Sequence, residues 1–157
     1  MKNRQYIIFV VDDNEASLTA CKQILKPFYV VYPLPSALKM FDLLEHVTPD
    51  MILLDVEMSD MNGHEAIKIL KEKEKYRDLP VIFLSAKNDA ESEIEGLKLG
   101  AMDYIEKPFV STLLLNRIGL HLSQAEYRVK LSEIKTCLSG TGEDAEQILA
   151  KIKSILE

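Results

Sequence analysis

The sequence has little of what would place it among disulfide-stapled, membrane-spanning or nucleic-acid-binding proteins. Its 157 residues include only two cysteines, Cys21 and Cys137, both in segments of helical spacing, so we expect reduced thiols and a cytoplasmic protein. No apolar run approaches the roughly 18–20 residues of a membrane span, and the run at 6–11 is too short for a signal peptide. The net charge of −6 argues against direct binding of nucleic acid by this chain, because such surfaces are basic.

The sequence does contain short apolar runs that alternate with longer amphipathic segments. The runs predict five strands, at 6–11, 29–32, 51–56, 81–85 and 103–105. The first, third and fourth are almost wholly apolar, which is typical of strands buried on both faces of a parallel sheet, and the short last one is expected at an edge. The pattern therefore predicts an α/β fold, a doubly wound parallel sheet covered by helices on both faces.

Polar residues stand where the predicted strands end, and in such a sheet ligands bind beyond the carboxyl ends of the strands. They are Asp12 and Asp13 after the first strand, Asp55 at the end of the third, Ser85 at the end of the fourth, and Lys107 after the fifth. Three carboxylates in one crevice repel one another unless a hard cation or an ammonium group lies among them. Because all the ligands are oxygens, the sequence predicts a Mg²⁺ site at this edge.

Four segments in fixed order resemble the CheY-like receiver domain of two-component response regulators. They are VVDDN at 10–14, LLDVEM at 53–58, LSA at 84–86 and GAMDYIEKPF at 100–109. The resemblance covers residues 1–122 as a domain, with the motifs inside 6–122. It implies a flavodoxin-like fold with five parallel strands in the order 2-1-3-4-5 and a cytoplasmic phosphorylation switch rather than an enzyme acting on other molecules.

The resemblance also implies roles for individual residues. Asp55 would accept a phosphoryl group from a histidine kinase or a phosphotransfer protein. Mg²⁺ would be bound by Asp12, Asp13, Asp55 and the backbone carbonyl of Glu57, and Lys107 would pair with the phosphoryl group. Ser85 and Tyr104 would form the switch that changes the surface of the fourth helix, fifth strand and fifth helix. The Lys107–Pro108 peptide bond would be cis, the form that only X-Pro bonds adopt readily.

Two departures from the family pattern lie near Asp55. Ser59 stands where the family usually has proline, which predicts a less rigid loop. Glu57 adds a negative side chain, and Lys87 is expected to form an ion pair with it across the mouth of the site. We expect this pair to affect how fast the phosphoryl group is hydrolysed.

Residues 123–157 are predicted to form a helical extension, made of a continuation of the fifth helix to about Leu138 and a short last helix. Apolar residues recur every seven positions along the fifth helix and into this extension, at Leu113, Leu120, Tyr127 and Ile134, and Leu131 and Leu138 recur on an adjoining line. Such a stripe packs either on its own domain or in a parallel two-helix homodimer. The segment 139–142 is expected to break the helix, and Thr141 to cap the last one. The chain is expected to be a receiver with a helical appendage or a piece of a longer regulator, with the extension linking to an output domain.

Two other functions are weighed against the switch. A small Mg²⁺-dependent phosphatase with an aspartyl-phosphate intermediate also combines an aspartate nucleophile with a lysine, and Glu57 is its one candidate for the second acid. Dinucleotide binding is disfavoured because no Gly-x-Gly-x-x-Gly turn follows the first strand. None of the three histidines has a partner at metal-ligand spacing, and His121 is expected to be solvated.

Overall fold

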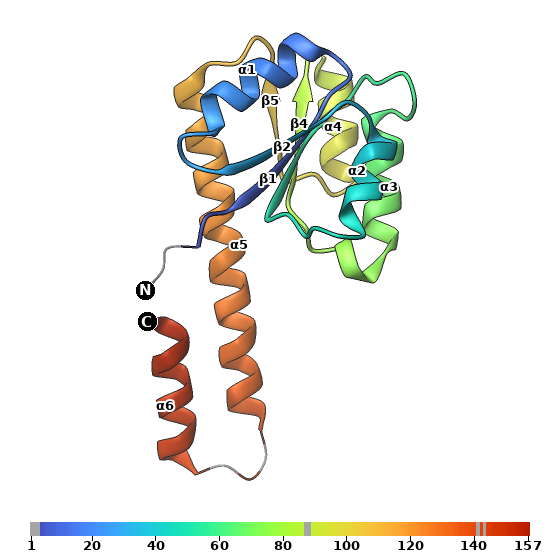
Figure 1. The fold of residues 1–157 in the computed structure, drawn as a ribbon. Helices are drawn as coiled ribbons and strands as arrows, with labels where there is room; N and C mark the ends of the chain where they lie inside the picture. The colour runs from blue at the N-terminus through green and yellow to red at the C-terminus, as the bar shows by residue number, and fades with distance from the viewer. Residues whose placement is uncertain (1–3, 87–88, 141, 143) are drawn as a thin grey trace. The chain divides into compact units, whose positions relative to one another are not determined.

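A computed structural model describes residues 4–86, 89–140, 142 and 144–157, and it contains the predicted parallel sheet. The strands are β1 (Ile7–Val11), β2 (Val30–Leu34), β3 (Met51–Asp55), β4 (Val81–Ser85) and β5 (Asp103–Glu106). They pair in parallel in the order β2-β1-β3-β4-β5, which confirms the flavodoxin-like topology and the edge position of the last strand (Figure 1). The predicted strand boundaries differ from these by two residues at most.

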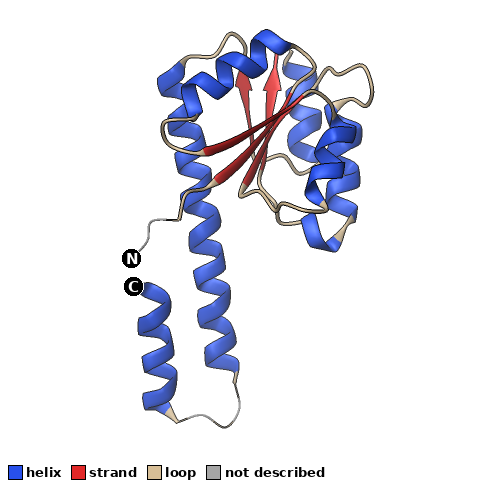
Figure 2. Ribbon diagram, in the orientation of Figure 1, coloured by secondary structure: helices blue, strands red, loops and turns tan. Residues whose placement is uncertain are grey.

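Helices cover both faces of the sheet (Figures 1 and 2). Those before the last strand are α1 (Glu15–Leu25), α2 (Ala37–Leu44), α3 (Gly63–Glu72) and α4 (Ala90–Lys98), with a 3₁₀ turn η1 (Glu74–Tyr76) after α3. Figure 1 shows α1 and the start of α5 (Ser111–Ser139) on one face, and α2, α3 and α4 on the other. All residues of β3 and β4 are buried, as expected for strands that are covered on both sides.

Alternate strand residues point to opposite faces and build two apolar layers. Phe9, Val11 and Phe83 belong to a buried cluster with residues of α2 and α3. Cys21 and Leu25 of α1 are fully buried, as are Leu114 and Ile118 of α5. The polar residues at the strand ends are therefore positioned by a sheet that is packed on both faces.

Local capping explains where the helices begin. Ser36 caps α2, its Oγ accepting a hydrogen bond from the backbone N–H of Lys39. Asn62 and Glu65 form a capping box that starts α3 directly after the loop that follows β3. Gly100, just after α4, has φ +109°, a backbone conformation that L side chains rarely adopt.

The chain divides into two compact units, Met1–Ile118 and Gly119–Glu157. The predicted boundary at Leu122 stays a prediction. Helix α5 is one continuous helix of 29 residues that ends at Ser139, close to the predicted Leu138. The second unit also contains α6 (Ala145–Leu156). In the ranges that the structure describes, no helix is both long and apolar enough to cross a membrane.

Two predictions about the second unit are wrong, the cap of its last helix and the exposure of His121. Asp144 caps α6, its side chain accepting a hydrogen bond from the Gln147 N–H, so the predicted cap at Thr141 is wrong. Thr141 itself lies outside the described residues. His121 is buried, with 9% of its surface exposed, and the prediction that it is solvated is also wrong. Periodicity in one segment does not reveal which neighbours cover a polar side chain.

Candidate functional site

The carboxyl ends of three strands bring Asp12, Asp55 and Lys107 into direct contact. The Lys107 ammonium donates hydrogen bonds to Asp12 Oδ2 at 2.6 Å and to Asp55 Oδ1 at 2.9 Å. Asp12 and Lys107 are 95 residues apart in the chain, and only the parallel sheet makes them neighbours. The other oxygen of Asp12 accepts a hydrogen bond from the Asn14 N–H, which orients its carboxylate. The Lys107–Pro108 peptide bond is cis.

Burial and mutual repulsion change the protonation chemistry of this group. Asp12 is fully buried and Asp55 is 6% exposed. Burial raises the pKa of Asp55 to about 6, and the neighbouring Asp12 charge adds to the rise, while the hydrogen bond from Lys107 opposes it. Burial alone would lower the pKa of Lys107, but its bonds to Asp12 and Asp55 outweigh burial and raise it. The lysine therefore stays cationic between two carboxylates.

Asp13 completes a cluster that could hold a cation. One carboxylate oxygen from each of Asp12, Asp13 and Asp55 lies within 4.8 Å of the others. The donors are all hard oxygens, and the three carboxylates share one lysine ammonium. This donor set suits a hard divalent cation that keeps several waters.

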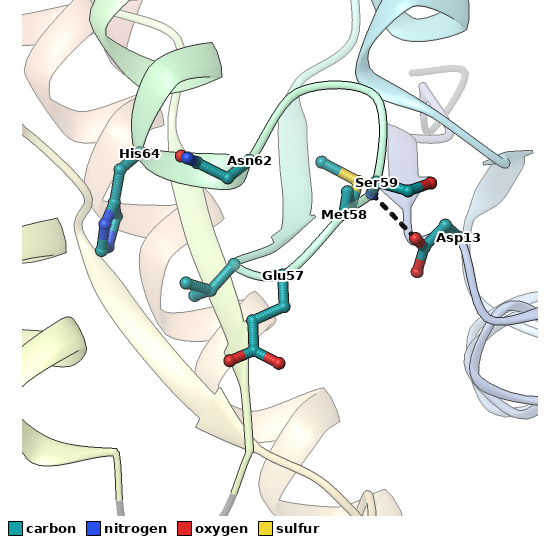
Figure 3. A pocket seen from close by; sticks show the side chains of 7 residues that line it. Asp13, Glu57, Met58, Ser59, Asn62 and His64 are labelled. Atoms are coloured by element: carbon teal, nitrogen blue, oxygen red, sulfur yellow. Dashed lines mark hydrogen bonds between the residues drawn. The ribbon is translucent and has the colours of Figure 1, made fainter.

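The loop after β3 forms one wall of an open pocket of about 520 Å³ beside the carboxylates (Figure 3). The backbone N–H of Ser59 donates to Asp13 Oδ2 at 3.0 Å, drawn as the dashed line in Figure 3. A proline at this position has no N–H, so the departure from the family pattern adds a hydrogen bond to a member of the acidic cluster. The pocket is lined by Asp13, Val56, Glu57, Met58, Ser59, Asn62 and His64.

The remaining predicted residues surround the cluster and make other contacts. Ser85 is fully buried, and its hydroxyl donates to Glu93 Oε1 on α4 at 2.9 Å. Tyr104 is half-buried, with the Arg117 guanidinium carbon 5.8 Å from its ring centroid. Glu57 is exposed and lines the pocket, while its predicted partner Lys87 lies outside the described residues.

Sequence reasoning missed Glu93 and Arg117. Arg117 donates to Asp103 Oδ1 at 2.6 Å and contacts the backbone carbonyl of Tyr104. Neither residue is part of a motif, and each reaches its partner from a helix that packs against the end of a strand. No signal in the sequence pairs them, because the contacts depend on how the helices are placed.

Comparisons with known proteins show which sequences and folds this chain is similar to. The family model described as "Response regulator receiver domain" matches residues 8–119. A probable cyclic di-GMP phosphodiesterase of Vibrio cholerae is 35% identical over 118 residues, which is 75% of this chain, and this chain spans only 27% of the length of that relative. A crystal structure described as a putative response regulator from Chloroflexus aurantiacus has a TM-score of 0.74 and 25% identity, covering 76% of this chain and 99% of that one. The signal receiver domain of a histidine kinase from Syntrophus aciditrophicus has a TM-score of 0.69 and 28% identity, covering 76% and 91%.

Proposed function

This chain belongs to the response regulator receiver domain family of two-component signalling, and on that premise we propose that Asp55 is its phosphoacceptor. The donor is the phosphohistidine of a histidine kinase or of a phosphotransfer protein. The observation that carries the proposal is the contact of Lys107 with both Asp12 and Asp55 at the carboxyl ends of the strands. In this arrangement a carboxylate nucleophile lies beside a fixed positive charge, and the next residue, Val56, lines the open pocket together with Asp13.

The transfer is a single displacement at phosphorus. A carboxylate oxygen of Asp55 forms the new P–O bond, the P–N bond of the donor breaks, and the imidazole leaves with the electron pair. Lys107 neutralises charge on the transferred phosphoryl oxygens. Asp12, Asp13, Asp55 and the Glu57 carbonyl would hold Mg²⁺, which supplies further charge neutralisation at those oxygens when it is bound. Burial raises the pKa of Asp55, so a cation beside its carboxylate would favour the ionised form.

The response is a rearrangement of Ser85 and Tyr104. The Ser85 hydroxyl donates to a phosphoryl oxygen on Asp55, and Tyr104 moves inward toward the space that Ser85 leaves. The face formed by α4, β5 and α5 then differs between the two states. Apart from transfer onto and hydrolysis from Asp55, the chain itself catalyses no reaction on other molecules.

A phosphorylation assay tests this proposal against the phosphatase alternative. The chain is incubated with acetyl phosphate and Mg²⁺, and intact-protein mass spectrometry follows the adduct. We expect one phosphoryl group per chain, lost slowly and absent in Asp55→Asn, with Asp42→Asn on the exposed side of α2 as the matched control. Rapid multiple turnover of phosphomonoesters would favour the phosphatase instead.

We further propose that the α5 extension forms a homodimer. Most of the apolar residues on its two neighbouring lines are exposed: Leu120, Tyr127, Leu131 and Leu138 each leave more than half of their surface open, while Ile134 is half-buried. Exposed apolar residues at heptad spacing are typical of a helix that pairs with a second one. Sedimentation of the full chain should show a dimer that Leu131→Glu dissociates and Ser132→Glu, one residue away, does not. A monomer at all concentrations, or a Leu131→Glu dimer of unchanged strength, would contradict the proposal.

A further inference from the structure

The hydroxyl of Ser85 already has a strong acceptor in the unphosphorylated chain. Ser85 Oγ lies 2.9 Å from Glu93 Oε1, and the Ser85 side chain is fully buried at the end of β4. A hydrogen bond from a hydroxyl to a carboxylate is charge-assisted and stronger than one between neutral groups. The serine is therefore directed toward α4 and not toward the carboxylates that accept Lys107.

The carboxylate of Glu93 is held in place by the first turn of α4. Glu93 is half-buried, and the next turn packs closely on β4, since a Cβ added to Gly96 would lie 2.5 Å from the Phe83 ring. His64 of α3 fixes the residue before Glu93, because its Nε2 lies 3.1 Å from the Ser92 carbonyl oxygen and 3.3 Å from Ser92 Oγ. Glu93 is thus a positioned acceptor and not a free surface side chain.

A serine hydroxyl has one proton to donate, so its two acceptors compete. We propose that Glu93 is a positioning residue that holds Ser85 in the unphosphorylated arrangement and opposes capture of a phosphoryl oxygen on Asp55. This inference rests on the proposed function, because the second acceptor is a phosphoryl oxygen on Asp55. Phosphorylation then has to break the Ser85–Glu93 hydrogen bond. Its loss removes one contact between β4 and the first turn of α4.

The competition sets how tightly the chain holds the phosphoryl group. Removing Glu93 leaves the Ser85 proton free to be donated toward Asp55. A net hydrogen bond to a charged group corresponds to about tenfold or more in an equilibrium constant. We therefore expect about tenfold tighter binding of a phosphoryl mimic when Glu93 is replaced by alanine, and a smaller gain for Glu93→Gln, whose amide oxygen still accepts but is uncharged.

The test is a double-mutant cycle on the full chain with beryllofluoride and Mg²⁺. Dissociation constants are measured for the wild type, Glu93→Ala, Ser85→Ala and the double variant, and circular dichroism verifies that each is folded. Glu91→Ala is the charge control, since Glu91 is an exposed acid in the same turn. The proposal requires that Glu93→Ala tightens binding about tenfold with Ser85 present, and that most of this gain disappears with Ser85→Ala.

The cycle separates failure of this inference from failure of the proposed function. An equal gain in both backgrounds, or a gain no larger than that of Glu91→Ala, would mean that Glu93 acts only through its charge, and would overturn the inference alone. Binding that is absent in the wild type, or unchanged in Asp55→Asn, would overturn the proposed function and the inference with it.

Discussion

Replacing Asp55, the proposed phosphoacceptor, by asparagine should stabilise the fold when no metal is bound. Asp55 is 6% exposed, and its pKa is raised to about 6 from an ordinary 3.8, first by burial. The folded chain keeps this proton up to about pH 6, whereas the unfolded chain loses it near pH 3.8. Folding stability therefore falls as pH rises between these values, and the full loss is present above pH 6.

The size of the effect follows from the two pKa values. Each pKa unit corresponds to about 1.4 kcal/mol, so the ionised carboxylate destabilises the fold by at most about 3 kcal/mol. Asparagine removes the charge but also weakens one of the two hydrogen bonds of Lys107. We expect Asp55→Asn to raise the free energy of unfolding by about 1–3 kcal/mol at pH 7.5.

Urea unfolding in EDTA measures this difference directly. The gain should be present at pH 7.5 and should shrink toward zero at pH 4, and Asp42→Asn on the exposed side of α2 should change stability little at either pH. Added Mg²⁺ should stabilise the wild type more than Asp55→Asn, because the variant lacks one oxygen ligand. A variant less stable than the wild type in EDTA at pH 7.5, or a gain that does not depend on pH, would refute the reasoning.

Three further predictions concern a residue that lines the pocket, the packing of α4 on β4, and the reactivity of the two cysteine thiols. Glu57→Ala should lengthen the half-life of the phosphorylated chain by about threefold, because the pocket loses an acceptor for the attacking water; an unchanged half-life would contradict this. Gly96→Ala should destabilise the fold by about 1–3 kcal/mol in urea, because its Cβ would lie 2.5 Å from Phe83, whereas Gly119→Ala in open space should stabilise it by up to about 1 kcal/mol. In a thiol-reagent assay at pH 8 the native chain should react at Cys137, while Cys21, buried and with its pKa raised to about 12, should react only on unfolding.

Much of the fold was predictable because its signals are local. Strands buried on both faces must be almost wholly apolar, which makes β1, β3 and β4 visible as runs in the sequence. Caps such as Ser36 act within three residues, so the start of α2 could also be predicted. The predicted cap of α6 was wrong because more than one polar residue precedes that helix in the sequence, and Asp144 is the one whose side chain accepts the hydrogen bond from the Gln147 N–H.

By itself, the sequence determined the α/β class, the alternation of elements and the edge of the sheet at which Asp12, Asp55 and Lys107 would meet. Strand-end residues of a parallel sheet must gather at one edge, so the contact follows from the topology. Only the tertiary structure decided that Ser85 donates to Glu93 and that the Ser59 N–H donates to Asp13. Those contacts depend on how a helix or a loop sits against the end of a strand, and no periodicity along the chain encodes that placement.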